Sequence, residues 1–467
     1  MVISRDIDTR KHLGLTRRRF LQSTLLAGGL GFSLGDFLRL RAQATQPGRS
    51  QPDTAVIQIW LGGGPSQFET FDPKPDAEVE FRGPYQPIRT RLPGILFCEK
   101  LPRLAALADR AAIIRSVTHT TYDHMTGALW CSTGYPTTNA TILHPSSGSV
   151  AANFRGDRHS GLPAYVQLSE EQTRNPELAR VMGPGHLGAR SSPFTILQDP
   201  FVNEYQADKV AVAVANLRLA DDVTLARSQD RTTLLASLDR TRRAADALQE
   251  FDHFHRQALD MVTSGAARRA FDLNQEPLAV RRRYGEHRWG QMGLLARRLV
   301  EAGTTFVTLN TAPDSLCWDW HRHIVNDNRP ADGSDGPTRG MDISGPPLDQ
   351  MISALIEDIY QRGLDRKVLL VVWGEFGRTP RVNATGGRDH WGALMSILLA
   401  GGGLRVGQVV GASSCKGETP RDRPVSPTEV LATVYRHLGI DPRGHTEDRS
   451  GRPFAFLPNG EPIRELI

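Results

Sequence analysis

Acidic and imidazole side chains follow four predicted strands, at the points where these strands end. Zinc and manganese favour such a mixture of neutral imidazoles and ionised carboxylates, because it balances a divalent charge and leaves a position for water or substrate. A bound cation would polarise an ester oxygen or lower the pKa of a water. The residues concerned are Ser66, Glu69 and Asp72 after 54–61, His119, Asp123 and His124 after 111–117, Asp319, His321 and His323 after 304–310, and Glu375, Arg378, Asp389 and His390 after 367–374.

Each of these groups also has a structural explanation. The stretch from Asp319 to His323 is equally typical of a loop whose side chains bond to backbone, and Glu375 with Arg378 is equally typical of a structural ion pair. The coincidence of four groups at four strand ends favours a binding or catalytic site.

The elements that would position these residues alternate along the chain. Continuous apolar runs predict buried strands, and amphipathic stretches between them predict helices. Strands alternating with helices predict a three-layer α/β fold with a mostly parallel sheet, in which ligands collect at the carboxyl ends of the strands. The predicted strands are 54–61, 111–117, 163–169, 304–310, 367–374 and 393–402; the predicted helices are 100–110, 124–134, 287–303, 346–364 and 426–440, with a helical insertion at about 200–300.

The composition indicates a folded, water-soluble protein, with 39% hydrophobic and 23% charged residues. Residues 1–44 carry eight basic and three acidic residues, and this excess equals the formal net charge of +5 of the whole chain. The remainder has no Lys/Arg-rich stripe with interleaved aromatics, so nucleic acid is not an expected partner.

The N-terminal segment 1–44 has the order of features of an export signal: a basic stretch, a mild apolar run and a small-residue cleavage site at Ala42-Gln43-Ala44. Arg17 and Arg18 resemble a twin-arginine signal, which predicts the twin-arginine export machinery as a partner. The apolar run is too short for a stable membrane span. We therefore expect a mature domain at 45–467 that is periplasmic or extracellular.

Cysteines and glycines exclude several other kinds of site. Four widely spaced cysteines without a CxxC argue against a zinc ribbon, and they leave two disulfides or isolated thiols open. The glycines at 62–64 lack the rest of a dinucleotide fingerprint or a P-loop, so a nucleotide site is not expected.

Several motifs together resemble one known family. GGGPSQFETFDPKPD, WDWH, GEFGRTPRVN with GRDHW, LAGGG and the terminal GRPF occur in the order typical of the exported bacterial family called domain of unknown function 1501. That family is placed in the alkaline phosphatase and sulfatase-like superfamily. The resemblance implies an alkaline phosphatase-like fold and a metal-dependent hydrolase of phosphate, or less expectedly sulfate, esters, with a small-molecule or polysaccharide ester as substrate.

The resemblance also implies residue roles. Zinc, manganese or magnesium would be held by Asp319, His321, His323, Glu375, Asp389 and His390. His124 would be the nucleophile unless water attacks, Arg378 would steady the substrate anion, and Ser66, Asp72 and His119 would contact the substrate. Two departures from the superfamily pattern keep a non-catalytic binding protein open as the alternative: glycines stand where an acid follows the first strand, and Phe376 stands where a histidine is expected.

Overall fold

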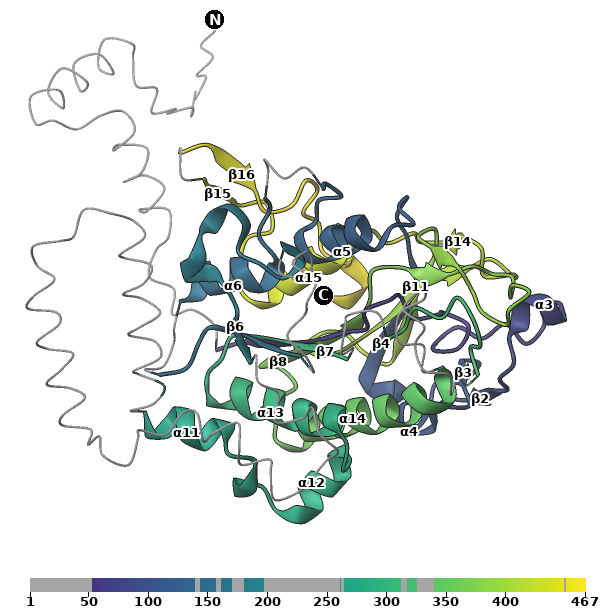
Figure 1. Cartoon of the computed structure of the whole chain (residues 1–467), viewed down its shortest axis with the longest axis horizontal. Coiled ribbons are helices and arrows are strands. Elements are labelled where there is room, and N and C mark those ends of the chain that lie inside the picture. The colour runs from purple at the N-terminus through teal and green to yellow at the C-terminus, as the bar shows by residue number, and fades with distance from the viewer. Residues whose placement is uncertain are drawn as a thin grey trace, which may run out of the picture. The chain divides into compact units, whose positions relative to one another are not determined.

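A mixed eight-stranded sheet forms the centre of the part of the chain that the structure describes (Figure 1). This computed structural model describes residues 53–138, 143–156, 161–169, 180–196, 261, 264–311, 317–325, 340–448 and 451–467. The predicted signal segment and residues 200–260 and 262–263 of the predicted helical insertion lie outside these ranges. No helix within them is long and apolar enough to cross a membrane.

The strands lie in the order β12-β4-β11-β8-β1-β7-β5-β6, and only β11 runs antiparallel to its neighbours. The prediction of a mostly parallel sheet is therefore confirmed. The strands are β1 Ala55–Trp60, β4 Ala111–Val117, β5 Tyr165–Leu168, β6 Phe194–Ile196, β7 Phe306–Asn310, β8 Val368–Trp373, β11 Met395–Gly401 and β12 Gln408–Val410.

Helices cover both faces of this sheet (Figure 1), so the predicted three-layer α/β architecture is confirmed. One face carries α4 Pro102–Ala106, α11 Gly265–Phe271, α12 Leu278–Tyr284, α13 Arg288–Ala302 and α14 Met341–Gln361; the other carries α5 His124–Thr133, α6 Ser147–Arg155 and α15 Pro427–His437. The short helix α3 spans Val79–Arg82.

Four pairs of short strands lie outside the main sheet. They are β2 Pro87–Arg89 with β3 Leu96–Cys98, β9 Gly377–Arg378 with β10 His390–Trp391, β13 Ala412–Ser413 with β14 Pro420–Asp422, and β15 His445–Glu447 with β16 Pro453–Ala455. The β9–β10 pair carries candidate site residues in both of its strands, with Arg378 in β9 and His390 in β10.

Strand β1 is buried on both faces, as its continuous apolar run predicts. Ile57 and Ile59 belong to the core on one side of the sheet, and Val56 and Trp60 belong to the core on the other. This alternation is the two-residue period of a strand with a helical layer on each side.

Local sequence signals explain several helix ends. Gly303 ends α13 in the left-handed conformation, with φ of 118°, and Ser426 and Glu429 form a capping box at the start of α15. Helix α14 begins at Met341, five residues before the start that Pro346 and Pro347 indicate, and it continues through both prolines. Within 264–303 the described part of the predicted insertion forms α11, α12 and α13.

Candidate metal centre

The carboxyl ends of β1, β4, β7 and β8 lie at one edge of the sheet, because these four strands share one direction. Their pairings are parallel, or pass through β11, which is antiparallel to both β4 and β8. The segments that follow these strands carry the candidate residues singled out in the sequence. The topology thus brings four distant parts of the chain to one place.

Three imidazoles converge on the carboxylate of Asp319. Its Oδ2 lies 3.2 Å from Nε2 of His124, and its Oδ1 lies 3.1 Å from Nε2 of both His321 and His390. The buried guanidinium of Arg378 donates to the same Oδ1 at 2.5 Å. We call His124, Asp319, His321 and His390 the histidine cluster.

The other ring nitrogen of each imidazole is also held. Nδ1 of His124 lies 2.8 Å from Oε1 of Glu375, and Nδ1 of His321 lies 2.8 Å from Oδ1 of Asp389. Nδ1 of His390 lies 2.8 Å from the backbone oxygen of Tyr122. Such partners fix ring orientation and leave Nε2 to face a common point, which is the arrangement of metal-ligating histidines.

The donor atoms fit a divalent cation. One ligand atom each from His124, Asp319 and His390 lie within 4.8 Å of one another. Oε2 of Glu375 is buried beside the cluster and has no hydrogen-bond partner among the residues that the structure describes. An unsatisfied buried carboxylate oxygen is costly, and a cation would offset that cost.

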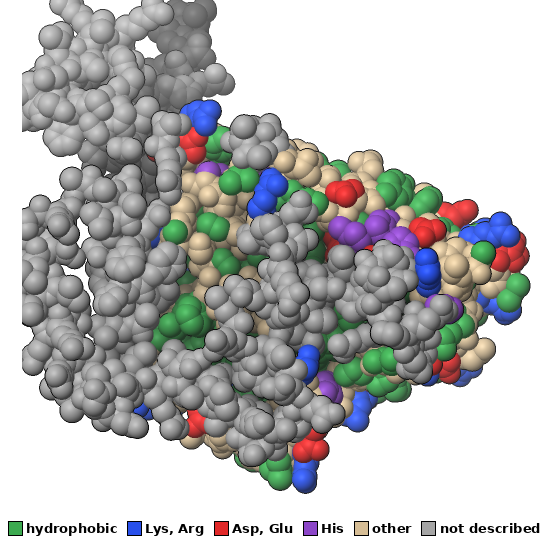
Figure 2. Space-filling model, in the orientation of Figure 1, with side chains coloured by type: hydrophobic (Ala, Val, Ile, Leu, Met, Phe, Trp, Pro, Cys, Tyr) green, Lys and Arg blue, Asp and Glu red, His purple; other side chains and the backbone are tan. Residues whose placement is uncertain are grey.

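The cluster is reachable from solvent. The side chains of His124, His321 and His390 are 25%, 27% and 21% exposed, while that of Asp319 is 8% exposed. Figure 2 shows histidine side chains gathered beside acidic ones on the visible face of the molecule. A ligand can therefore approach from the histidine side, with the carboxylate beneath it.

The electrostatics of the cluster favour a negative charge on Asp319 and a proton on His124 and on His321. Burial alone would raise the pKa of Asp319, but the hydrogen bonds from the three histidines and the charge of Arg378 lower it well below its usual range. Burial would lower the pKa of His124, but its bonds to Asp319 and Glu375 raise it to about 9. The hydrogen bond to Asp319 likewise raises the pKa of His321.

The glycines after β1 serve close packing at this edge. The amide of Gly63 donates to Oε1 of Glu375 at 2.8 Å. Gly64 has φ of 81°, and a Cβ there would lie 2.4 Å from the ring of Phe376. Only glycine suits such a position, so this run builds the floor of the cluster.

Arg378 lies under the cluster and does not face solvent. It is 1% exposed, and besides Asp319 it donates to the backbone oxygens of Gly63, Gly64, Trp318 and Arg388. These contacts describe a residue that holds Asp319 in place. Its predicted contact with a substrate anion stays a prediction.

The remaining predicted residues lie around the cluster. His119 is buried, and its Nε2 lies 2.6 Å from the backbone oxygen of Glu375. Ser66 accepts from the amide of Phe68, and Asp72 forms ion pairs with Lys74 and Arg115. None of the described contacts joins the side chains of Ser66 or Asp72 to the cluster. The amide of His323 donates to the backbone oxygen of Thr385, and the role of this histidine as a ligand stays a prediction.

The predicted roles of His124 and Asp389 stay predictions. Nε2 of His124 faces the same carboxylate as Nε2 of His390. Asp389 is 57% exposed, and its Oδ1 lies 2.8 Å from Nδ1 of His321, the ring nitrogen that points away from Asp319. The signal in the sequence that places His124 at the site is its position at the start of α5, shortly after the end of β4.

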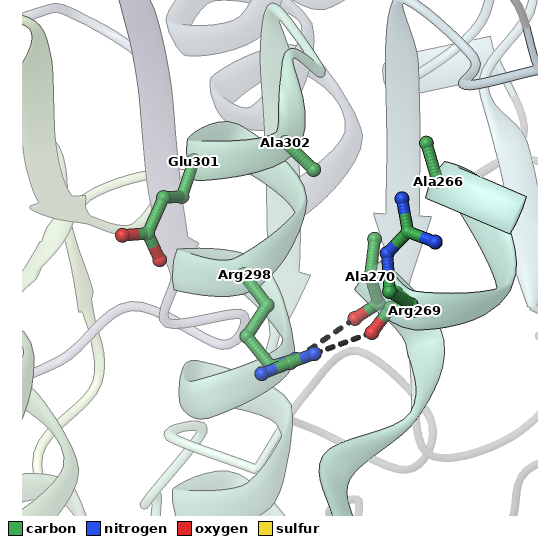
Figure 3. A pocket seen from close by; sticks show the side chains of 6 residues that line it. All are labelled: Ala266, Arg269, Ala270, Arg298, Glu301 and Ala302. Carbon is green, nitrogen blue, oxygen red and sulfur yellow. Dashed lines mark hydrogen bonds between the residues drawn. The ribbon is translucent and has the colours of Figure 1, made fainter. Parts of the chain in front are cut away.

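A different pocket lies between α11 and α13 and has a volume of about 400 Å³ (Figure 3). Its central side chain, Arg298, already donates to the backbone oxygens of Ala270 and Arg269 (Figure 3). Ala266, Glu301 and Ala302 complete its lining. This pocket contains none of the predicted site residues.

The cysteines form no disulfide with one another. Cys131 lies below the cluster, where its Sγ is 3.6 Å from the backbone oxygen of Glu375, and burial holds its pKa well above the usual value. It is therefore a packed thiol.

Solved structures similar to this chain come from the alkaline phosphatase and sulfatase-like proteins. An alkaline phosphatase PafA mutant shares 9% identity at a TM-score of 0.40, covering 90% of this chain and 100% of that one. The phosphonate monoester hydrolase SpPMH from Silicibacter pomeroyi shares 13% identity at a TM-score of 0.37, covering 89% of this chain and 78% of that one. The lipoteichoic acid synthase LtaP from Listeria monocytogenes shares 9% identity at a TM-score of 0.37, covering 87% of this chain and 75% of that one.

No curated protein matches the chain in sequence. The family described as "Protein of unknown function (DUF1501)" matches residues 53–467, which is nearly all of the chain beyond the predicted signal. The match spans the glycine run after β1, the histidine cluster and the β9–β10 pair. The resemblance seen in the motifs is thereby confirmed, and the chain belongs to the DUF1501 family.

Proposed function

We propose that the protein is an exported, metal-dependent hydrolase of phosphate esters, with sulfate esters as less favoured substrates. The observation that carries this proposal is the convergence of three imidazole Nε2 atoms on the Asp319 carboxylate at 3.1–3.2 Å. Export is supported by the twin-arginine pattern of the N-terminal segment. The ester substrate is a small molecule or a polysaccharide.

In this proposal His124, Asp319 and His390 bind one divalent cation, with His321 as the neighbouring fourth ligand. A cation held there would supply Lewis-acid chemistry to an ester oxygen. Glu375 and Asp389 hold the backs of His124 and His321, which keeps both Nε2 atoms directed at the site. Arg378 keeps Asp319 ionised and fixed, so it acts as a positioning residue.

Water is the proposed attacking group. In this proposal the Nε2 lone pair of His124 binds the cation and Glu375 holds Nδ1 at 2.8 Å, so neither nitrogen is free to attack a phosphorus atom. Among the described residues, no serine or threonine hydroxyl hydrogen-bonds to the imidazoles or carboxylates of the cluster.

One observation favours the alternative of a non-catalytic binding protein. Phe376 is fully buried, and its ring centroid lies 5.0 Å from that of His124 and 4.7 Å from that of His390. An apolar ring therefore fills the place where the superfamily pattern calls for a further histidine. The site is accordingly proposed for a single cation, and a site of this kind can hold an anion without cleaving it.

Elemental analysis together with turnover tests the proposal. The folded protein should contain about one equivalent of zinc or manganese and should hydrolyse some member of a panel of phosphate monoesters and diesters. His390→Ala should lose both properties, whereas His445→Ala, at an exposed position in β15, should keep them. Cation uptake without turnover across phosphate and sulfate esters would favour the binding protein. A folded protein that takes up no cation would refute the metal site.

A further inference from the structure

We propose that the buried ion pair between Glu69 and Arg388 is a positioning pair for the cation site, an inference that rests on the proposed function. Nε of Arg388 lies 3.1 Å from Oε2 of Glu69, and Nη2 lies 3.0 Å from Oε1. Both side chains are 1% exposed. Neither residue touches the cluster directly, yet Arg388 immediately precedes Asp389 and His390.

Arg388 ties together the segment that leads to the cluster. Its Nη1 donates to the backbone oxygens of Thr379 and Pro380 at 3.0 and 2.5 Å, so it closes the loop between β9 and β10. Its own amide donates to the backbone oxygen of Trp320 at 2.9 Å. The side chain and backbone of one residue thus fix the segments that carry His390 and His321.

We call Glu69 and Arg388 the clamp. The loop after β1, which carries Glu69, makes further contacts with the β9–β10 segment. Gln67 donates to the backbone oxygen of Arg378 and accepts from its amide, both at 2.9 Å, so it holds β9. The centroid of the Phe68 ring lies 4.0 Å from the guanidinium carbon of Arg388. A Cβ at Gly83 would lie 2.2 Å from Oε1 of Glu69, which shows how closely the pair is enclosed.

These contacts give the GGGPSQFET stretch a structural role, which is to hold the segments that carry the cluster. Gly63 holds Glu375, Gln67 holds β9, and Glu69 holds the residue before Asp389. Metal ligands need placement to within about 0.5 Å, and supporting partners typically change metal affinity by about 10- to 100-fold. The planar guanidinium of Arg388 donates in several fixed directions at once, so its enclosed pairing with Glu69 holds the segment rigidly. Lysine cannot reproduce this planar set of donors.

The test compares Glu69→Gln and Arg388→Lys with Arg297→Lys. Arg297 is an equally buried arginine in α13 that pairs with Glu276 and Asp358. In the metal-free protein, both clamp variants should lose about tenfold or more of the amide exchange protection at residues 389–391. They should also bind zinc about tenfold or more weakly. Arg297→Lys should unfold at a lower temperature and change neither quantity.

Unchanged protection, or unchanged zinc affinity, in both clamp variants would overturn the proposal, as would an equal loss in Arg297→Lys. If Glu69→Gln does not fold, Phe68→Leu replaces it, because that change removes the ring under Arg388 and keeps both charges. Failure of the wild type to bind zinc would refute the proposed function. Exchange protection in the metal-free protein would then still decide whether the pair holds residues 389–391.

Discussion

The Nε2 atoms of His321 and His390 lie 2.9 Å apart, and both lie 3.1 Å from the same oxygen of Asp319. A neutral imidazole has one donor and one acceptor nitrogen. If both Nε2 atoms donate to Asp319, their contact with each other joins two donors. A cation at this point would instead receive a lone pair from each ring, which makes the close approach favourable.

Replacing Asp319 should therefore have two separable effects. Asp319→Asn removes the anionic ligand and leaves the buried Arg378 without its counter-charge, which should cost about 3–5 kcal/mol of stability. Cation affinity should fall by more than about 100-fold, beyond the loss typical of a supporting residue. Titration calorimetry and thermal unfolding measure the two effects. Asp389→Asn, at a 57% exposed position, should weaken binding by only about tenfold and leave stability nearly unchanged.

Cation uptake should release protons at neutral pH. Because its carboxylate partners raise the pKa of His124 to about 9, this imidazole is protonated at pH 7 in the metal-free protein, and it must lose that proton to bind a cation. Affinity should rise about tenfold per pH unit and per proton released between pH 7 and pH 9. Calorimetry in two buffers of different ionisation enthalpy counts the protons, and a count of zero would exclude His124 as a ligand.

His287 should make stability fall in mild acid. Its Nδ1 accepts from the amide of Gly290 at the start of α13, and burial lowers its pKa to about 4. Because the unfolded chain binds this proton more readily, the stabilisation is complete above about pH 6.5 and is lost as pH falls toward 4. At pH 5 the loss should be about 2 kcal/mol relative to pH 8.

The variant His287→Asn tests this directly. Asparagine retains the cap and does not titrate, so the variant should lose less stability than the wild type between pH 8 and pH 5. Denaturant unfolding at the two pH values gives the comparison. Equal losses in both proteins would assign the acid sensitivity to other groups.

A methyl group at Gly64 should disturb the cation site through Phe376. The left-handed backbone alone costs alanine about 1–2 kcal/mol, and the contact of 2.4 Å with the Phe376 ring adds an overpacking cost of about 1–3 kcal/mol. Gly94 has φ of 76°, and a methyl group there would meet no atom within 4 Å. Gly94→Ala should therefore show the backbone cost alone and normal zinc binding, whereas Gly64→Ala should lose more stability and bind zinc more weakly.

Much of the fold follows from patterns that act over short distances. The apolar run of β1, the cap formed by Ser426 and Glu429, and Gly303 at the end of α13 are set by burial, capping and backbone freedom. The common edge for the four groups of candidate residues follows from the rule that parallel strands end together. Strand β11 could be located as a strand, but its reversed direction depends on pairings with distant strands.

The roles within the site depend on side-chain direction, which no spacing in the sequence specifies. Arg378 is of the type that binds anions, yet it points into the protein and bonds to backbone oxygens. Asp389 stands beside His390 in the chain but contacts His321. Glu69 and Arg388 are 319 residues apart, so only the folded chain reveals that they pair.

Strand β4 has a consequence for the timing of folding during synthesis. Its two neighbours in the sheet, β11 and β12, lie far toward the C-terminus. The ribosome therefore completes β4, and His124 soon after it, long before either partner strand exists. These long-range pairings are expected to form late. An incomplete chain that ends before β11 would thus lack the pairings that bring His124 to the edge of the sheet. Only a chain whose synthesis has passed β11 and β12 would then be able to take up the cation.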